Sequence, residues 1–174
     1  WMVEYPASFM LVAAMNLCRC GRYGAREGAP CSCTRASVES YLQRVSGALL
    51  DRFDLRVRMD APTQALHRAA PAPSSDLLRE QVREARSLQQ QRWGSGSLNG
   101  QVAATTVDMQ LNPRARTRLE QLVELGMLSA RAQRSLVRVA RTIADLDGSG
   151  DIRSDDITRA RFLLAHPGGE QHAA

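Results

Sequence analysis

A segment rich in proline and alanine, residues 61–75, divides this chain of 174 residues into two parts with different hydrophobic patterns. Its three prolines interrupt regular structure, and the segment is typical of a linker. Before it, short apolar runs around a cysteine-rich loop predict α/β structure. After it, the apolar spacing is helical. We therefore expect two parts, residues 1–60 and 76–166, with a frayed tail at residues 167–174.

The first part predicts two short strands separated by a loop and a helix. The apolar run at residues 9–15 lacks polar alternation, which is typical of a strand buried on both faces of a parallel sheet. Apolar residues at helical spacing predict a helix over residues 37–50, with Ser37 as its N-cap. Alternating apolar and charged residues at 53–59 predict a second strand with one solvent-exposed face.

The second part predicts helices at about residues 77–92, from Pro113 onward, at about 129–146 and at 154–165. Pro113 occupies a first-turn position, where proline is well tolerated. The buried face of the third helix is predicted by its apolar residues at helical spacing, namely Ala132, Leu136, Ala140 and Ile143.

All 23 basic residues are arginine, against 18 acidic residues, giving a net charge of +5. The lack of lysine excludes Schiff-base chemistry and a P-loop lysine within this chain. Because the chain begins with Trp1, we expect it to be a piece of a longer protein. Its longest apolar run is far shorter than the ~20 residues that cross a membrane, and no basic leader precedes it. A cytoplasmic protein with no membrane partner is therefore expected.

The four cysteines all fall within sixteen positions, as Cys18, Cys20, Cys31 and Cys33. Without a sign of secretion, this clustering indicates metal or redox chemistry rather than a disulfide scaffold. Zinc takes four tetrahedral ligands, and two C-x-C pairs can supply them. The spacing alone leaves free or redox-active thiols open as the alternative.

An acidic stretch fits the pattern of an EF-hand calcium loop, with Asp145, Asp147, Ser149 and Asp156 at its first, third, fifth and twelfth positions. Three features weigh against calcium. The last ligand is Asp rather than the longer Glu, no second EF-hand is found, and the preceding helix carries an arginine stripe. A calcium-sensing helical module stays an alternative that calcium titration would test.

The arginine stripe consists of Arg131, Arg134, Arg138 and Arg141, at helical positions i, i+3, i+7 and i+10. Such a stripe beside an apolar face is ordinarily a solvated helix surface. We favour that interpretation for Arg134 and Arg141.

Several long segments resemble the magnesium-chelatase-related AAA+ ATPases of the ComM/YifB type. They are LVAAMN (residues 11–16), CxCG (18–21), YLQRVSGALLDRFDL (41–55), VREARSLQQQR (82–92) and LSARAQRSLVRVARTIADLDGS (128–149), in the family's order. The chain departs from the family at Leu17, Arg19 and Ala48, where the family usually has proline. These departures change backbone stiffness rather than a reacting group.

The resemblance implies that residues 1–60 end the α/β core of an AAA+ ATPase and that residues 76–166 form its helical lid. It implies ATP with Mg²⁺ as substrate and cofactor, and self-association into a ring, expected to be a hexamer. The ComM-like branch is associated with DNA branch migration of the helicase type during natural transformation, so DNA is an expected partner. The P-loop would lie upstream, and this chain alone would not hydrolyse ATP.

The resemblance also assigns site residues. Asn16 corresponds to sensor 1, which helps to orient the attacking water, although a loop cap is the alternative from the residues alone. Arg52 corresponds to the arginine finger that meets the neighbouring subunit's γ-phosphate, with a surface ion pair as the alternative. Arg44 is a weaker candidate for the same interface. Arg131 matches sensor 2, at a helix start whose free N–H groups suit phosphate.

The family has similar paired cysteines, which favours zinc, and its DLDGS stretch is a turn between helices. Two further functions stay open. One is a magnesium chelatase subunit that helps insert Mg²⁺ into a porphyrin, although we associate the cysteine loop with the ComM-like branch. The other is a non-catalytic, zinc-closed module whose Arg19, Arg22 and Arg26 contact nucleic-acid phosphates. A GxxxxGK[ST] element upstream would establish the ATPase.

Overall fold

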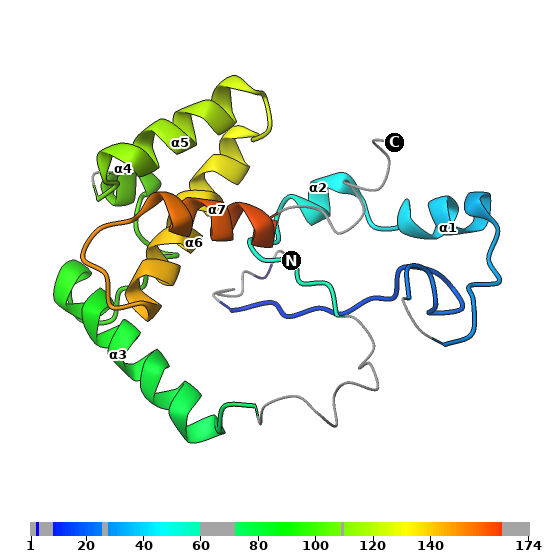
Figure 1. Cartoon of the computed structure of the whole chain (residues 1–174), viewed down its shortest axis with the longest axis horizontal. Coiled ribbons are helices and arrows are strands. Elements are labelled where there is room, and N and C mark those ends of the chain that lie inside the picture. The colour runs from blue at the N-terminus through cyan, green and yellow to red at the C-terminus, as the bar shows by residue number, and fades with distance from the viewer. Residues whose placement is uncertain (1–2, 4–8, 26–27, 60–71, 109, 165–174) are drawn as a thin grey trace. The chain divides into compact units, whose positions relative to one another are not determined.

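The computed structural model describes residues 3, 9–25, 28–59, 72–108 and 110–164 of the chain (Figure 1). Two compact units are present. The first is Trp1–Ser46 with Asp60–Thr63, and the second is Gly47–Met59 with Gln64–Ala174. The predicted linker falls mostly outside the described residues, as does the predicted tail, so these boundaries stay predictions. Residues Gly47–Met59 group with the helical unit.

The described residues of the first unit contain one helix, α1, at Arg35–Leu42. Thr34 is its N-cap, because the Thr34 hydroxyl accepts a hydrogen bond from the backbone N–H of Ser37 at 3.3 Å. The prediction of a single helix over residues 37–50 with Ser37 as N-cap is therefore wrong. A turn interrupts it, and a separate short helix, α2, follows at Gly47–Leu50 in the second unit. Residues 43–46 are not helical, and Gly47, the first residue of α2, has low helix propensity.

Neither predicted strand forms in the described part of the chain. Phe9 and Met10, in the first of these segments, have exposed fractions of 76% and 87%. A strand needs a neighbour for its backbone hydrogen bonds. The described residues offer one isolated parallel bridge, between Leu111 and Ile152. The predicted short parallel strands are therefore unconfirmed.

The second unit is a bundle of helices arranged around α6, which spans Ala130–Leu146 (Figure 1). Besides α2, the other helices of this unit in the described residues are α3 (Ser75–Trp93), α4 (Ala104–Asp108), α5 (Pro113–Glu124) and α7 (Ser154–Leu164). α6 contacts α3, α4 and α7, and α5 contacts α7. The predicted helices of this part are confirmed, and the predicted first-turn position of Pro113 is occupied as expected. The five-residue α4 was not predicted, since one turn is too short to display a period.

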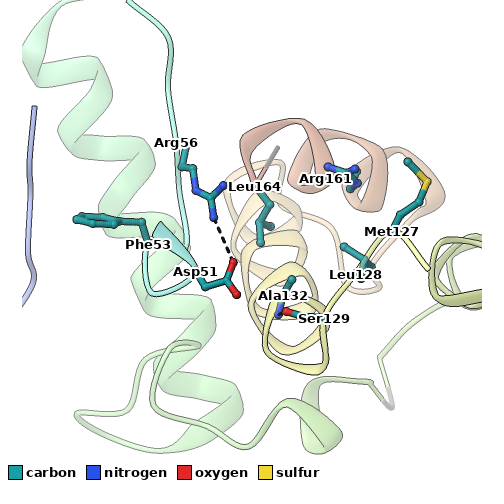
Figure 2. A pocket seen from close by; sticks show the side chains of 9 residues that line it. All are labelled: Asp51, Phe53, Arg56, Met127, Leu128, Ser129, Ala132, Arg161 and Leu164. Carbon is teal, nitrogen blue, oxygen red and sulfur yellow. Dashed lines mark hydrogen bonds and ion pairs between the residues drawn. The ribbon is translucent and has the colours of Figure 1, made fainter. Parts of the chain in front are cut away.

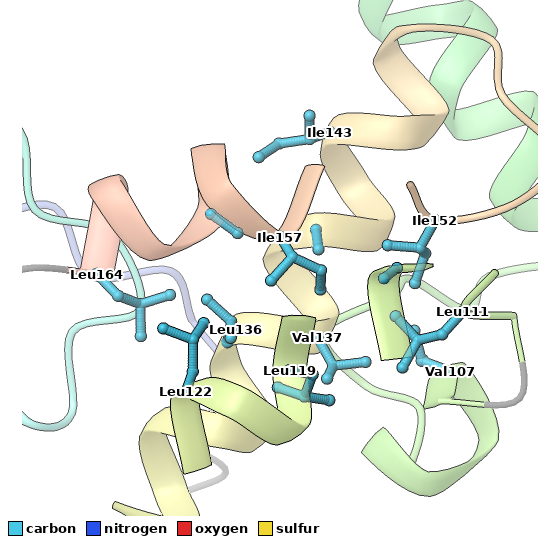
Figure 3. Packing of buried hydrophobic residues seen from close by; sticks show 13 residues of the cluster. Val107, Leu111, Leu119, Leu122, Leu136, Val137, Ile143, Ile152, Ile157 and Leu164 are labelled. Carbon is cyan, nitrogen blue, oxygen red and sulfur yellow. The ribbon is translucent and has the colours of Figure 1, made fainter. Parts of the chain in front are cut away.

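The core of this unit joins the apolar faces of α5, α6 and α7 (Figure 3). Its buried members include Leu119, Leu122, Leu136, Val137, Ala140, Ile143, Ile157 and Ala160. The predicted buried face of α6 is thereby confirmed, with Ala132 partly buried at its edge. None of the helices in the described residues combines the length and apolar character that crossing a membrane requires.

Candidate functional site

The structure brings the four cysteine sulfurs together. The Sγ atoms of Cys18 and Cys20 are 3.4 Å apart, and that of Cys31 lies 3.8 Å from Cys18 and 3.5 Å from Cys20. With Cys33 included, all four sulfurs lie within 4.8 Å of one another. Thiolates bound to zinc at ~2.3 Å in a tetrahedron are separated by roughly 3.8 Å. The spacing fits a tetrahedral metal site, and no disulfide joins these cysteines.

The chain turns tightly to place these thiols. The backbone N–H of Gly21 donates to the carbonyl of Cys18 at 3.2 Å, and Gly21 has a positive φ of 77°, which glycine adopts without strain. The N–H of Tyr23 donates to the buried Cys18 Sγ at 3.3 Å. This hydrogen bond favours the thiolate form, which is the form that binds metals.

The thiols differ in acidity. Backbone N–H groups of Arg22 and Ser32 lower the pKa of Cys20 to about 5. The pKa of Cys31 is raised to about 12: the N–H of Cys33 lowers it, but desolvation and the neighbouring Cys20 and Cys18 together outweigh that effect. Four adjacent thiolates therefore resist ionising together without a cation. A divalent soft metal would supply the missing positive charge.

Asn16 lies beside this cysteine loop and is exposed. A Cβ added at Gly21 would be 3.7 Å from Asn16 Nδ2, so the two residues are neighbours. Among the arginines that the sequence assigned to phosphate contacts, Arg19 and Arg22 are exposed, whereas Arg26 lies outside the described residues. The sensor 1 role of Asn16 stays a prediction.

Arg52 follows α2 and has an exposed side chain. Its guanidinium donates a hydrogen bond to the carbonyl of Ala48 in that helix. In the described part of the chain, neither Asp51 nor Asp54 forms an ion pair with Arg52. Asp51 lies 4.0 Å from Arg56 instead. No carboxylate of the described residues therefore neutralises Arg52, which leaves it available to an outside anion. Arg44, in the first unit, is also exposed.

The four arginines of the stripe on α6 have different environments. Arg131 and Arg134 are exposed, and Arg131 lies in the first turn, beside the N-cap Ser129. The guanidinium of Arg138 donates to the carbonyl of Val102 at 2.8 Å and 3.0 Å. Arg141 is fully buried, so its assignment to a solvated face is wrong.

Arg141 is held by the turn that follows its helix. Its guanidinium donates to the carbonyls of Ser149 at 2.6 Å and Gly150 at 2.8 Å, and it pairs with Asp145 at 3.1 Å. Burial lowers the pKa of Arg141, which its pairing with Asp145 partly offsets. The sequence offered one signal for this arrangement, since Arg141 and Asp145 are an i, i+4 pair of opposite charge.

The three carboxylates that fit the calcium-loop pattern, Asp145, Asp147 and Asp156, are all bound by arginines. Asp145 pairs with Arg92 at 2.8 Å, and Asp147 pairs with Arg153 at 2.8 Å and with Arg159 at 2.7 Å. Asp156 accepts from the backbone N–H of Arg153 at 2.8 Å. In the described part of the chain, the side chains gathered closely enough to share a metal are the four cysteines. This arrangement favours a turn between helices over a calcium loop.

A cavity of about 230 Å³ lies where residues 51–56 face the start of α6 and the end of α7 (Figure 2). It is lined by Asp51, Phe53, Arg56, Met127, Leu128, Ser129, Ala132, Arg161 and Leu164. The buried Nε atoms of Arg56 and Arg161 have no hydrogen-bond partner in the structure. Sequence reasoning missed Arg56, because alternation placed it on the solvent-exposed face of a strand.

Comparisons with known proteins match both parts of the chain. The family model described as magnesium chelatase, subunit ChlI, matches residues 1–67, and that described as magnesium chelatase, subunit ChlI C-terminal, matches residues 72–162.

Curated relatives cover most of the chain. The uncharacterized protein YifB of Escherichia coli strain K12 is 38% identical over 168 residues, which are 94% of this chain and 31% of that protein. Competence protein ComM of Haemophilus influenzae is 33% identical over 162 residues, 91% of this chain and 31% of that protein. An uncharacterized protein of Mycobacterium tuberculosis strain H37Rv is 34% identical over 160 residues, 90% of this chain and 31% of that protein. The chain thus spans 31% of the length of these relatives.

Proposed function

This chain belongs to the magnesium chelatase subunit ChlI family, with ComM and YifB among its relatives, and on that premise we propose that it is the C-terminal part of an AAA+ ATPase. The observation that carries the proposal is the match of both parts of the chain, in order, to the two ChlI models. The exposed guanidinium groups of Arg52 and Arg131 support it, since phosphoryl transfer depends on positioned positive charge.

In this proposal the chain supplies three groups to ATP hydrolysis. Arg52 reaches the γ-phosphate held by a neighbouring subunit, where its guanidinium stabilises the charge of the transition state through two parallel hydrogen bonds. Arg131 contacts the nucleotide of its own subunit from the start of α6, assisted by free backbone N–H groups there. Asn16 orients the attacking water. The P-loop lysine and the groups that bind Mg²⁺ belong to the rest of the protein, so this chain alone does not hydrolyse ATP.

The proposed work of this ATPase is DNA remodelling by a ring, expected to be a hexamer. Support comes from the 33% identity to competence protein ComM of Haemophilus influenzae. The exposed Arg19 and Arg22 beside the cysteines offer positive charge to DNA phosphates. We propose branch migration of the helicase type as the specific reaction.

We further propose that the four cysteines bind one zinc ion. Their thiol donors and mutual spacing fit a tetrahedral structural site, with Cys18 buried at its base. The metal would close the loop at residues 18–33 rather than take part in ATP hydrolysis. Binding it would also relieve the repulsion between adjacent thiolates.

The second candidate function is that of a magnesium chelatase subunit, in which ATP hydrolysis supports insertion of Mg²⁺ into a porphyrin. The descriptions of the two matching family models favour it. We rank it second because of the cysteine loop, whose charge and metal site suit a nucleic-acid partner. A non-catalytic, zinc-closed module that binds nucleic acid is the alternative without ATP.

ATP turnover by the full-length protein separates these functions. We expect Mg²⁺-dependent hydrolysis that branched DNA accelerates and that protoporphyrin leaves unchanged. Acceleration by protoporphyrin with Mg²⁺ would establish the chelatase function instead. Binding of DNA with no turnover under any of these conditions would leave the non-catalytic module.

A further inference from the structure

The segment that carries Arg52 is attached to the helical lid by polar contacts. The backbone N–H of Arg56 donates to the carbonyl of Leu163, in α7, at 2.7 Å. The carboxylate of Asp54 accepts a hydrogen bond from the hydroxyl of Ser135, in α6. Ser135 is buried and Asp54 is exposed, so this bond is partly buried, at the surface of the helical unit. We call residues 51–56 the finger segment.

Apolar packing contributes little to this attachment. Leu55 and Val57 have exposed fractions of 54% and 64%. The cavity of about 230 Å³ separates part of the finger segment from α6 and α7 (Figure 2). Because little apolar surface is buried here, the hydrogen bonds account for much of what keeps the segment in place.

The hydrogen bond between Asp54 and Ser135 joins the finger segment, which carries Arg52, to α6, which carries Arg131. Asp54 lies two residues after Arg52. Ser135 lies four residues after Arg131, so the two share one side of α6 a single turn apart. Arg52 itself is exposed. Its guanidinium donates to the carbonyl of Ala48, and its backbone N–H donates to the carbonyl of Leu49 at 2.9 Å. The position of the finger segment therefore depends on where the lid helix α6 lies.

We propose that the hydrogen bond between Asp54 and Ser135 is a latch that positions Arg52 according to the placement of its own subunit's lid. The proposal rests on the proposed function, in which Arg131 follows the subunit's own nucleotide and Arg52 serves the neighbour's. Asp54 and Ser135 are positioning residues, since neither contacts substrate. Through this hydrogen bond, the nucleotide state of one subunit's site changes the position of Arg52 at the neighbouring subunit's site.

The test compares full-length variants that break the latch. Ser135→Ala and Asp54→Ala should each lower kcat for ATP about tenfold, the factor that corresponds to a charge-assisted hydrogen bond of ordinary strength. KM for ATP should stay unchanged, because nucleotide contacts remain. Ser135→Thr keeps the hydroxyl and should restore most of the turnover. Ser87→Ala makes the same chemical change at an exposed position of α3, and Asp151→Ala matches the removal of a carboxylate at an exposed loop. Both should behave like the unmutated protein.

Two further readouts separate a positioning role from a merely structural one. Hydrogen exchange at residues 53–57 should be faster in Ser135→Ala, while exchange in the core of α6 stays the same. Ser135→Ala should lower turnover no further when Arg52 is already alanine, because the latch acts through Arg52. A full additional loss in that background would show a general lid effect and overturn the latch.

The outcomes distinguish the latch from the proposed function. Wild-type kcat in both Ser135→Ala and Asp54→Ala would refute the latch and leave the ATPase intact. Absence of ATP turnover in the unmutated full-length protein would refute the ATPase, and the latch with it. If Ser135→Ala fails to fold, Asp54→Ala on the exposed segment decides the question alone.

Discussion

Arg141 and Arg134 belong to the same stripe on α6, yet one is buried and the other is exposed. Replacing Arg141 with alanine leaves the buried carboxylate of Asp145 with one arginine fewer and two turn carbonyls without their donor. We expect Arg141→Ala to lower the free energy of unfolding by about 3 kcal/mol. Arg134→Ala, on the solvent face, should change it by less than about 0.5 kcal/mol. Urea unfolding followed by circular dichroism measures both, and equal losses would contradict the assignment.

Sequence reasoning could predict the spacing of these arginines but not their environments. Periodicity places Arg131, Arg134, Arg138 and Arg141 along one stripe, and it says nothing of the chain that folds back over them. Arg141 is buried because the turn after α6 presents the carbonyls of Ser149 and Gly150 to it. The sequence also could not predict the hydrogen-bond partner of Ser135, since Asp54 lies 81 residues away along the chain.

At the scale of elements, the cysteine loop gives a direct prediction. The protein should contain about one zinc per chain by elemental analysis. Cys20→Ser should abolish stoichiometric zinc, because zinc binds a serine hydroxyl far more weakly than a thiolate. Arg19→Ala, an exposed residue between two of the ligands, is the matched control and should retain the metal. A protein purified without chelator that carries no zinc would contradict the metal site.

The helix predictions are confirmed where an N-cap residue or a first-turn proline precedes apolar residues at helical spacing. Ser129 caps α6 and Pro113 begins α5, with Asn112 as its N-cap. The wrong helix prediction and the unconfirmed strand predictions lie where tertiary contacts outweigh the local sequence pattern. The helix predicted over residues 37–50 breaks over residues 43–46, just before Gly47, whose weak helix propensity the apolar spacing did not reveal. The predicted strands depend on neighbouring strands, which a local pattern cannot supply.

At the scale of the whole molecule, the chain spans 31% of the length of its curated relatives. Two groups proposed for catalysis belong to different sites in the proposed ring: Arg131 serves its own subunit and Arg52 serves the neighbour. In that arrangement, one copy of the chain does not complete either proposed site. Activity is therefore a property of the assembled full-length protein in this account.

The measurement that tests the central claim most directly is ATP turnover by full-length Arg52→Ala, beside ATP binding by the same variant. An arginine finger supplied by a neighbour contributes a factor of ~10³ or more to turnover. We expect Arg52→Ala to bind ATP normally and to lose about that factor in kcat, whereas Arg114→Ala, an exposed arginine of α5, keeps full turnover. Unchanged turnover in Arg52→Ala would contradict the finger role and the ring ATPase built on it.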